Sequence, residues 1–467
     1  MQNQAIENSA GKPIFSKKAL VRLIVPLIIE QFLLLSVGMA DTLMVTTAGE
    51  AAVSGVSLVD NINMLLIQIF AALSTGGAVV VSQYLGSRKK DAGQRSAKQL
   101  MYTTTVFSTV IMILALVFRR HVLSLVFGNI EPDVMESALV YFLTTAIAYP
   151  FMAIYNAGAA LFRSVGNSKI SMLNSLIVNI VNITVNAVLI YGFNMGALGA
   201  GIGTLTSRIV AAVFILVLWQ RRSNELRIIK LFKPEFHGRI VKQILSVGIP
   251  NGLENGMFQI GRLLVLSLIT TFGTNVVAAN AIGNSIAGVI NVPGQAIGLA
   301  MVVVIGQCMG AGNTRQAVDY TKKLMLAVYV LMGALCVLQF VLTDSLVGIF
   351  NLTPRAASIA SQVLRYSAVF TALIWPLSFD LPNSLRASGD VVFPMVISLV
   401  SMFVCRVGLS YVLACDWGLN LGLLGVWLAM FADWIVRSVF FIVRFAKGKW
   451  KHKKVAVNKK NQPPQGR

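Results

Sequence analysis

The amino-acid sequence predicts an all-α integral membrane protein with twelve transmembrane helices in two duplicated six-helix lobes. The composition supports this, because the chain is 56% hydrophobic and 12% charged with a mean hydropathy of +0.74. Soluble domains average about 25% charged residues. Apolar runs long enough to cross a bilayer alternate with short polar loops along the chain. The second half of the chain also repeats the first.

Twelve apolar runs satisfy the requirement of about 20 residues for a transmembrane helix. Most are bounded by loops that carry glycine or clustered charges, where a span is expected to end. The predicted spans are residues 20–45, 56–83, 98–118, 137–162, 170–192, 197–219, 242–270, 277–307, 321–342, 358–385, 391–415 and 420–445.

The internal repeat has a constant step of 224 residues. An even number of helices in each half inserts both halves with the same orientation, so we expect an axis along the membrane normal to relate them. Asp41 is an exception, because Val265 stands at its repeat position. The matched pairs are Pro26/Pro250, Glu30/Glu254, Thr46/Thr270, Thr47/Thr271, Gly49/Gly273, Gln83/Gln307 and Gly86/Gly310.

The repeat and the loop charges together predict five segments. They are an N-terminal arm (1–19), an N-lobe of helices 1–6 (20–219), an inter-lobe linker (220–241), a C-lobe of helices 7–12 (242–446) and a basic tail (447–467).

The net charge of +21 is distributed as in a membrane protein, not as in a nucleic-acid-binding protein. Lys and Arg gather in the arm, in alternate loops and in the tail, whereas the other loops carry only Arg119, Arg120 and Arg355. This positive-inside pattern predicts a multi-pass protein of the plasma (inner) membrane with both termini in the cytoplasm. The lipid bilayer is the expected partner, and nucleic acid is not.

The most informative polar group lies in the outer half of the first lobe. Asp41 is one turn from the outer end of the first span, and a carboxylate inside a bilayer is a functional candidate by default. Asn182 and Asn186 share a face of the fifth span, and Thr204 lies about two turns into the sixth, so all four reach a similar depth. The asparagines bind a cation here, or they hold helices together by hydrogen bonds.

A second polar set has two alternative interpretations, a structural ion-pair network or a role toward substrate or protons. Glu30 is predicted to share a helix face with Asp41, and the others belong to the C-lobe. The candidates are Glu30, Glu254, Gln259, Arg262, Arg406 and Asp433.

Enzymatic chemistry and resident cofactors are not expected. The three histidines fall in predicted loops or the tail, and no phosphate-binding GxxxxGK[ST] motif is present. The four cysteines lack the spacing of a metal site and are interpreted as packed thiols.

These residues bring out a family likeness, because the chain resembles the multidrug and toxic compound extrusion (MATE) family of bacterial transporters. The resemblance implies two lobes in a V and export of organic, often cationic, compounds driven by inward movement of H⁺ or Na⁺. It also implies that Asp41, Asn182, Asn186 and Thr204 form the cation-coupling site, although several members have Asp where this chain has Asn186. The segments that carry the resemblance are 39–45, 82–86, 161–166, 248–259, 385–390 with 393–395, and 422–427.

The expected function is therefore a secondary active antiporter that works as a monomer on small organic substrates. With Asp41 as the sole carboxylate of its cluster, a proton is favoured over Na⁺ as the coupling ion, although Asp41 also remains a candidate Na⁺ ligand. A lipid-linked precursor flippase is the alternative, and an uncoupled channel or receptor is a further one.

Overall fold

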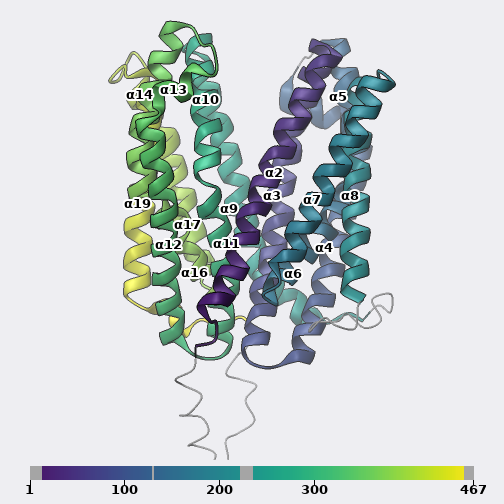
Figure 1. Cartoon of the computed structure of the whole chain (residues 1–467), viewed down its shortest axis with the longest axis vertical. Coiled ribbons are helices and arrows are strands. Elements are labelled where there is room, and N and C mark those ends of the chain that lie inside the picture. Colours follow the sequence, from purple (N-terminus) through teal and green to yellow (C-terminus); the bar gives the residue numbers. More distant parts are fainter. Residues whose placement is uncertain (1–12, 129–130, 221–234, 457–467) are drawn as a thin grey trace, which may run out of the picture. The chain divides into compact units, whose positions relative to one another are not determined.

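The structure, a computed structural model, describes residues 13–128, 131–220 and 235–456, and every regular element in these ranges is a helix (Figure 1). This follows from the composition, since a backbone in lipid must satisfy its hydrogen bonds within the helix. Each of the twelve predicted spans coincides with a helix or with a broken run of helices, so the predicted fold class is confirmed.

The chain divides into two compact units, Lys18–Gly252 and Leu253–Arg467 with Met1–Lys17, here called the N-lobe and the C-lobe. The helices that lie wholly or mainly in the N-lobe are α2 (Lys17–Val45), η1 (Thr46–Ala48), α3 (Glu50–Gly86), α4 (Lys90–Phe127), α5 (Pro132–Ile147), α6 (Tyr149–Ser164), α7 (Ser168–Asn186), η2 (Ala187–Gly192) and α8 (Gly196–Gln220).

Helix α9 (Gly238–Thr270) passes from the first unit into the second. The C-lobe continues with α10 (Thr274–Ile290), α11 (Val292–Gly310), α12 (Thr314–Val341), α13 (Thr343–Gly348), α14 (Pro354–Leu373), α15 (Trp375–Phe379), α16 (Leu381–Ser388), α17 (Val392–Ser401), η3 (Met402–Gly408), α18 (Leu409–Ala414), α19 (Gly422–Ala446) and η4 (Lys449–His452).

Nine helices in the described ranges are long and apolar enough to cross a membrane, or eleven if each of two bent pairs is one span. The bends are 45° between α5 and α6 and 59° between α14 and the α15–α16 run. Pro150 and Pro376 begin the second helix of each pair, where a proline interrupts the backbone ladder. The remaining predicted span is α9, whose Glu254, Gln259 and Arg262 reduce its hydropathy.

The lobe boundary differs from the sequence prediction. It falls between Gly252 and Leu253, inside α9, and not at residue 242. The first part of α9 packs on α3, because a Cβ on Gly76 would lie 2.7 Å from the backbone nitrogen of Gly248. Only glycine permits this approach, so the beginning of α9 belongs to the N-lobe.

Both ends of the described chain pack on the C-lobe. The Phe15 amide donates to the Tyr320 hydroxyl at 3.0 Å, and that hydroxyl donates to the Phe15 carbonyl at 2.8 Å. After α19, Trp450 is fully buried and stacks on Phe445 with 5.1 Å between ring centroids. The described parts of the predicted arm and tail are therefore packed against this unit. Most of the linker, residues 221–234, lies outside the described residues.

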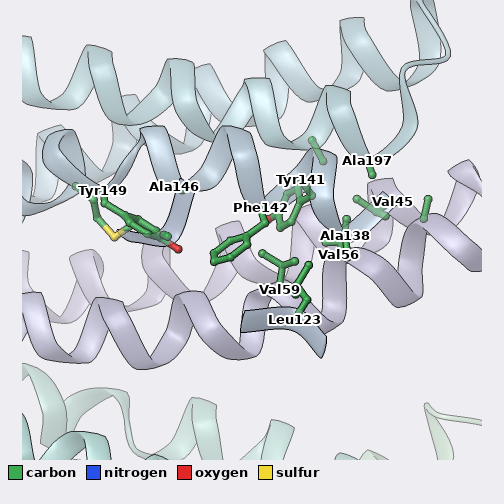
Figure 2. Close-up of a cluster of buried hydrophobic side chains, with 14 of the residues drawn as sticks. Val45, Val56, Val59, Leu123, Ala138, Tyr141, Phe142, Ala146, Tyr149 and Ala197 are labelled. Atoms are coloured by element: carbon green, nitrogen blue, oxygen red, sulfur yellow. The ribbon is translucent and has the colours of Figure 1, made fainter. Parts of the chain in front are cut away.

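A large hydrophobic cluster fills the N-lobe between α3, α4 and α5 (Figure 2). Tyr141 and Tyr149 belong to it, together with Val59 and Phe142. Buried tyrosine hydroxyls need hydrogen-bond partners, so these two rings connect the apolar core to the polar group described next.

Candidate functional site

The Asp41 group lies where α2, α7 and α8 meet. Asn186 Nδ2 donates to Asp41 Oδ1 at 2.6 Å and lies 3.4 Å from Asn182 Oδ1. Both asparagines are buried, and they lie one turn apart on α7 because their spacing is four residues. The structure thus places the first three predicted residues in direct contact.

Thr204 joins this group less directly. It follows Gly203, where a Cβ would lie 1.8 Å from Asn186 Oδ1, so α8 approaches the amide only because Gly203 has no side chain. The Thr204 side chain lies within hydrogen-bond reach of Tyr141. It therefore borders the group through a neighbouring tyrosine.

A second carboxylate, Asp60 of α3, belongs to the same site. The Tyr141 hydroxyl donates to Asp60 Oδ1 at 3.0 Å, and Asn63 Nδ2 does so at 3.3 Å. The Tyr149 hydroxyl in turn donates to Asn63 Oδ1 at 2.9 Å. Asp60 is near enough to Asp41 for their charges to repel. The prediction that Asp41 is the only carboxylate here is therefore wrong.

The site also contains a cation that the sequence analysis missed. Arg208 of α8 lies within electrostatic range of Asp41, and its guanidinium carbon is 5.9 Å from the centre of the Tyr155 ring. Its Nε is buried with no hydrogen-bond partner among the described residues. Arg208 lies one helical turn after Thr204, and this spacing was the available signal. Asp41, Asp60 and Arg208 together leave one excess negative charge when both carboxylates are ionised.

Glu30 is separate from the Asp41 group, although both carboxylates of α2 contact α7. Arg163 Nη1 donates to Glu30 Oε1 at 2.9 Å, and the Ser171 hydroxyl donates to Oε2 at 2.6 Å. A buried carboxylate with both oxygens satisfied holds helices α2, α6 and α7 together.

The C-lobe holds the repeat equivalent of this pair. Arg386 Nη2 donates to Glu254 Oε1 at 2.7 Å, and Arg437 Nη2 lies 3.9 Å from the same oxygen. Asp433 accepts the Ser401 hydroxyl at 2.6 Å and lies 3.9 Å from Arg406 and 4.0 Å from Arg437. These contacts form a buried network across α9, α16, η3 and α19.

Two of the predicted C-lobe residues have no polar partner in the described ranges. Gln259 makes no hydrogen bond there, and Arg262 makes neither a hydrogen bond nor an ion pair. Asp380, near the end of α15, is buried, and its Oδ2 has no partner among the described atoms. It does not pair with Arg386, whose hydrogen bonds go to Glu254 and Asn383.

A cation bound near Asp41 finds oxygen atoms but not a complete cage. No cluster of three or more His, Cys, Asp or Glu that suits a metal occurs in the described part of the chain. Asn186 Oδ1 is buried without a hydrogen-bond partner among the described atoms, so one amide oxygen beside Asp41 is available. The amide nitrogen of Asn186, however, points to the carboxylate. A Na⁺ ion bound to Asp41 requires this amide to turn.

Two helical units with a buried carboxylate–amide group and a repeated sequence define a transporter class built from internal repeats. The chain belongs to the MatE family, whose model matches residues 26–188 and 250–412. It is therefore a multi-pass membrane protein of the multidrug efflux transporter family.

Named relatives and solved structures agree with this assignment. The chain is 26% identical to a probable multidrug resistance protein NorM of Thermotoga maritima, with 95% of each chain covered. It is 27% identical to an uncharacterized transporter YisQ of Bacillus subtilis, covering 97% of this chain and all of the relative. A MATE crystal structure in a bent conformation has a TM-score of 0.86 at 22% identity, covering 96% and 98% of the two chains.

Proposed function

We propose that this protein is a secondary active antiporter of the plasma membrane that exports small organic compounds in exchange for H⁺ or Na⁺. The observation that carries the proposal is the Asp41–Asn186 hydrogen bond at 2.6 Å, inside a span and beside Asp60 and Arg208. An ionisable group in the membrane interior that responds to one bound cation is what coupling requires. The protein acts on its substrates as a monomer.

A proton is favoured as the coupling ion. Asp41 accepts an amide N–H, so its nearest contact is a donor and not another oxygen that would bind Na⁺. Protonation neutralises Asp41, removes its repulsion with Asp60 and weakens its attraction to Arg208. The contacts between α2, α3 and α8 then change with a single proton. By linkage, ion and substrate lower each other's affinity.

The test uses vesicles containing the purified protein and ethidium as the transported probe. We expect a pH gradient to drive transport with the Na⁺ gradient collapsed, and Asp41→Asn to abolish it while the protein remains folded. Asp416→Asn, which changes an exposed aspartate, is the matched control. Wild-type transport by the Asp41 variant contradicts the assignment of Asp41.

Two further outcomes bear on the alternatives. Transport driven by Na⁺ with the pH gradient collapsed, and lost in Asn182→Ala and Asn186→Ala, would make the asparagines Na⁺ ligands and overturn the preference for protons. Movement of a lipid-linked head group, without gradient-driven transport of soluble compounds, would support the flippase.

A further inference from the structure

Four arginines lie close together in the C-lobe, and their charge exceeds that of the carboxylates that contact them. We name Arg262, Arg386, Arg406 and Arg437 the arginine cluster. Only Glu254 and Asp433 make ion pairs with it in the described part of the chain. We infer that Arg262, Arg406 and Arg437 bind an oxyanion, a carboxylate, phosphate or sulfonate, on an organic molecule.

The strongest evidence is incomplete pairing inside the cluster. Arg386 is neutralised by Glu254 at 2.7 Å, but Arg406 and Arg437 lie 3.9 and 4.0 Å from Asp433 Oδ2, beyond hydrogen-bond distance. That oxygen has no hydrogen-bond partner among the described atoms. One carboxylate therefore attracts two guanidinium groups without closing a hydrogen bond to either.

Arg437 has hydrogen-bond donors left over in a place that water does not reach. Its residue is 2% exposed, and Nε and Nη1 are buried with no partner in the described ranges. Among the described contacts, only Nη2 makes a hydrogen bond, to the Ser378 carbonyl at 3.3 Å. Buried donors without acceptors are costly, so a ligand oxygen that accepts from them is strongly favoured.

Arg262 and Arg406 stand on the adjoining helices. The guanidinium carbon of Arg406 is 5.0 Å from the centre of the Phe258 ring, and Phe258 is one turn before Arg262 on α9. Arg262 is exposed, lacks a polar partner in the described ranges and lies near enough to Arg406 for their charges to repel. An anion between them relieves this repulsion.

The internal repeat shows that this charge is specific to the C-lobe. The two segments that match the family model begin 224 residues apart, at 26 and 250. This step places Arg406 at the position of Asn182 and Val265 at the position of Asp41. Equivalent places in the two lobes thus carry an acidic group in one and a cationic group in the other.

Aromatic rings line the cluster and indicate what the oxyanion is attached to. Arg437 lies over Phe379 at 4.6 Å and over Phe258 at 5.9 Å. Flat guanidinium groups beside aromatic faces suit an aromatic body that bears an anionic group. The exported compounds then include amphipathic anions and zwitterions. This substrate class rests on the proposed function, whereas binding itself does not.

The test compares 2-naphthalenesulfonate with naphthalene-2-sulfonamide, which has a similar shape and no charge. Calorimetry on the protein in nanodiscs of phosphatidylcholine should show the sulfonate binding at least about tenfold more tightly, since a charge-assisted hydrogen bond is worth about one decade or more in affinity. Arg262→Gln and Arg406→Gln should each remove most of this preference, and Arg406→Lys should retain part of it. Arg365→Gln, at an exposed pair with Asp344, should not change it.

Equal binding of the two probes by the wild-type protein would overturn the inference. Unchanged preference in both glutamine variants would do the same, and Arg262→Gln keeps the test decisive if Arg406→Gln does not fold. Loss of sulfonate binding in nanodiscs of phosphatidylglycerol would instead assign the site to a lipid phosphate. If sulfonate preference persists while gradient-driven transport is absent, the proposed function fails and the anion site stands.

Discussion

At the scale of single residues, Asp390 shows how a buried charge anchors a helix junction. It lies between α16 and α17, where its carboxylate is buried and accepts from Arg444 Nε at 2.7 Å and Lys453 Nζ at 2.9 Å. Burial alone raises the pKa of this carboxyl, but the hydrogen bonds and charges of Arg444 and Lys453 outweigh it and hold the pKa below its usual value. Asp390 therefore connects α19 and the tail to the end of α16.

This lowered pKa predicts a pH-dependent contribution to stability. The ionised form is stabilised in the folded protein, so the contribution is complete above the unfolded pKa of about 4 and is lost as the pH falls through the lower folded value. Asp390→Asn should cost about 1.5–3 kcal/mol at pH 7, because it removes a charged hydrogen-bond acceptor. Thermal unfolding in detergent measures this, with Asp416→Asn as the control.

The difference between wild type and Asp390→Asn should shrink when the pH falls below about 4. A difference that stayed constant from neutral to acid pH would show that the carboxylate charge is not what stabilises this junction.

At the scale of helices, the two lobes use equivalent ion pairs in unequal surroundings. Glu30 pairs with Arg163 between α2 and α6, and Glu254 pairs with Arg386 between α9 and α16. The repeat relates the two pairs, but Glu254 also lies 3.9 Å from Arg437. The first pair is therefore local, whereas the second is one part of a larger network.

Exchanging the charges of each pair distinguishes these two situations. Each single reversal, such as Glu30→Arg, should cost about 3–5 kcal/mol or more, because it leaves a buried charge without a partner. Combining Glu30→Arg with Arg163→Glu should recover much of this loss. Glu254→Arg with Arg386→Glu should recover less, since the new arginine faces Arg437.

Unfolding of the single and double variants in detergent gives the coupling energy of each pair. Equal recovery in the two lobes would show that Arg437 does not interact with Glu254 energetically.

At the scale of the whole molecule, the distribution of basic residues determines how the chain crosses the membrane. The connection between α3 and α4 carries three consecutive basic residues, Arg88, Lys89 and Lys90. The loop around Asn351, in contrast, has Arg355 as its one basic residue. The positive-inside rule therefore predicts that the first connection lies in the cytoplasm and the second outside.

Cysteine labelling on intact cells tests this orientation. In a variant whose four native cysteines are replaced by serine, Asn351→Cys should react with a membrane-impermeant thiol reagent, because its loop is expected outside. Lys89→Cys should react only after the membrane is opened. Both positions are exposed in the structure, so burial does not mask the result. The reverse pattern would place both termini outside the cytoplasm.

The sequence by itself determined the helical class, the spans, the internal repeat and three members of the Asp41 group. These follow from composition and from spacing along one helix, which fixes the face on which each residue lies. Asn182 and Asn186 share a face because of their spacing, and Asp41 lies at a matching depth because helix rise is constant. No contact between distant helices is needed for these conclusions.

Only the tertiary structure decided which faces meet. Asp60 and Arg208 join Asp41 because α3 and α8 turn those faces toward α2, and Asp433 attracts Arg406 because α19 packs on η3. The rotation of each helix about its axis depends on packing against neighbours far away in the chain, so helical spacing alone does not specify it. This packing changed one expected carboxylate into two and concentrated the arginines in the C-lobe.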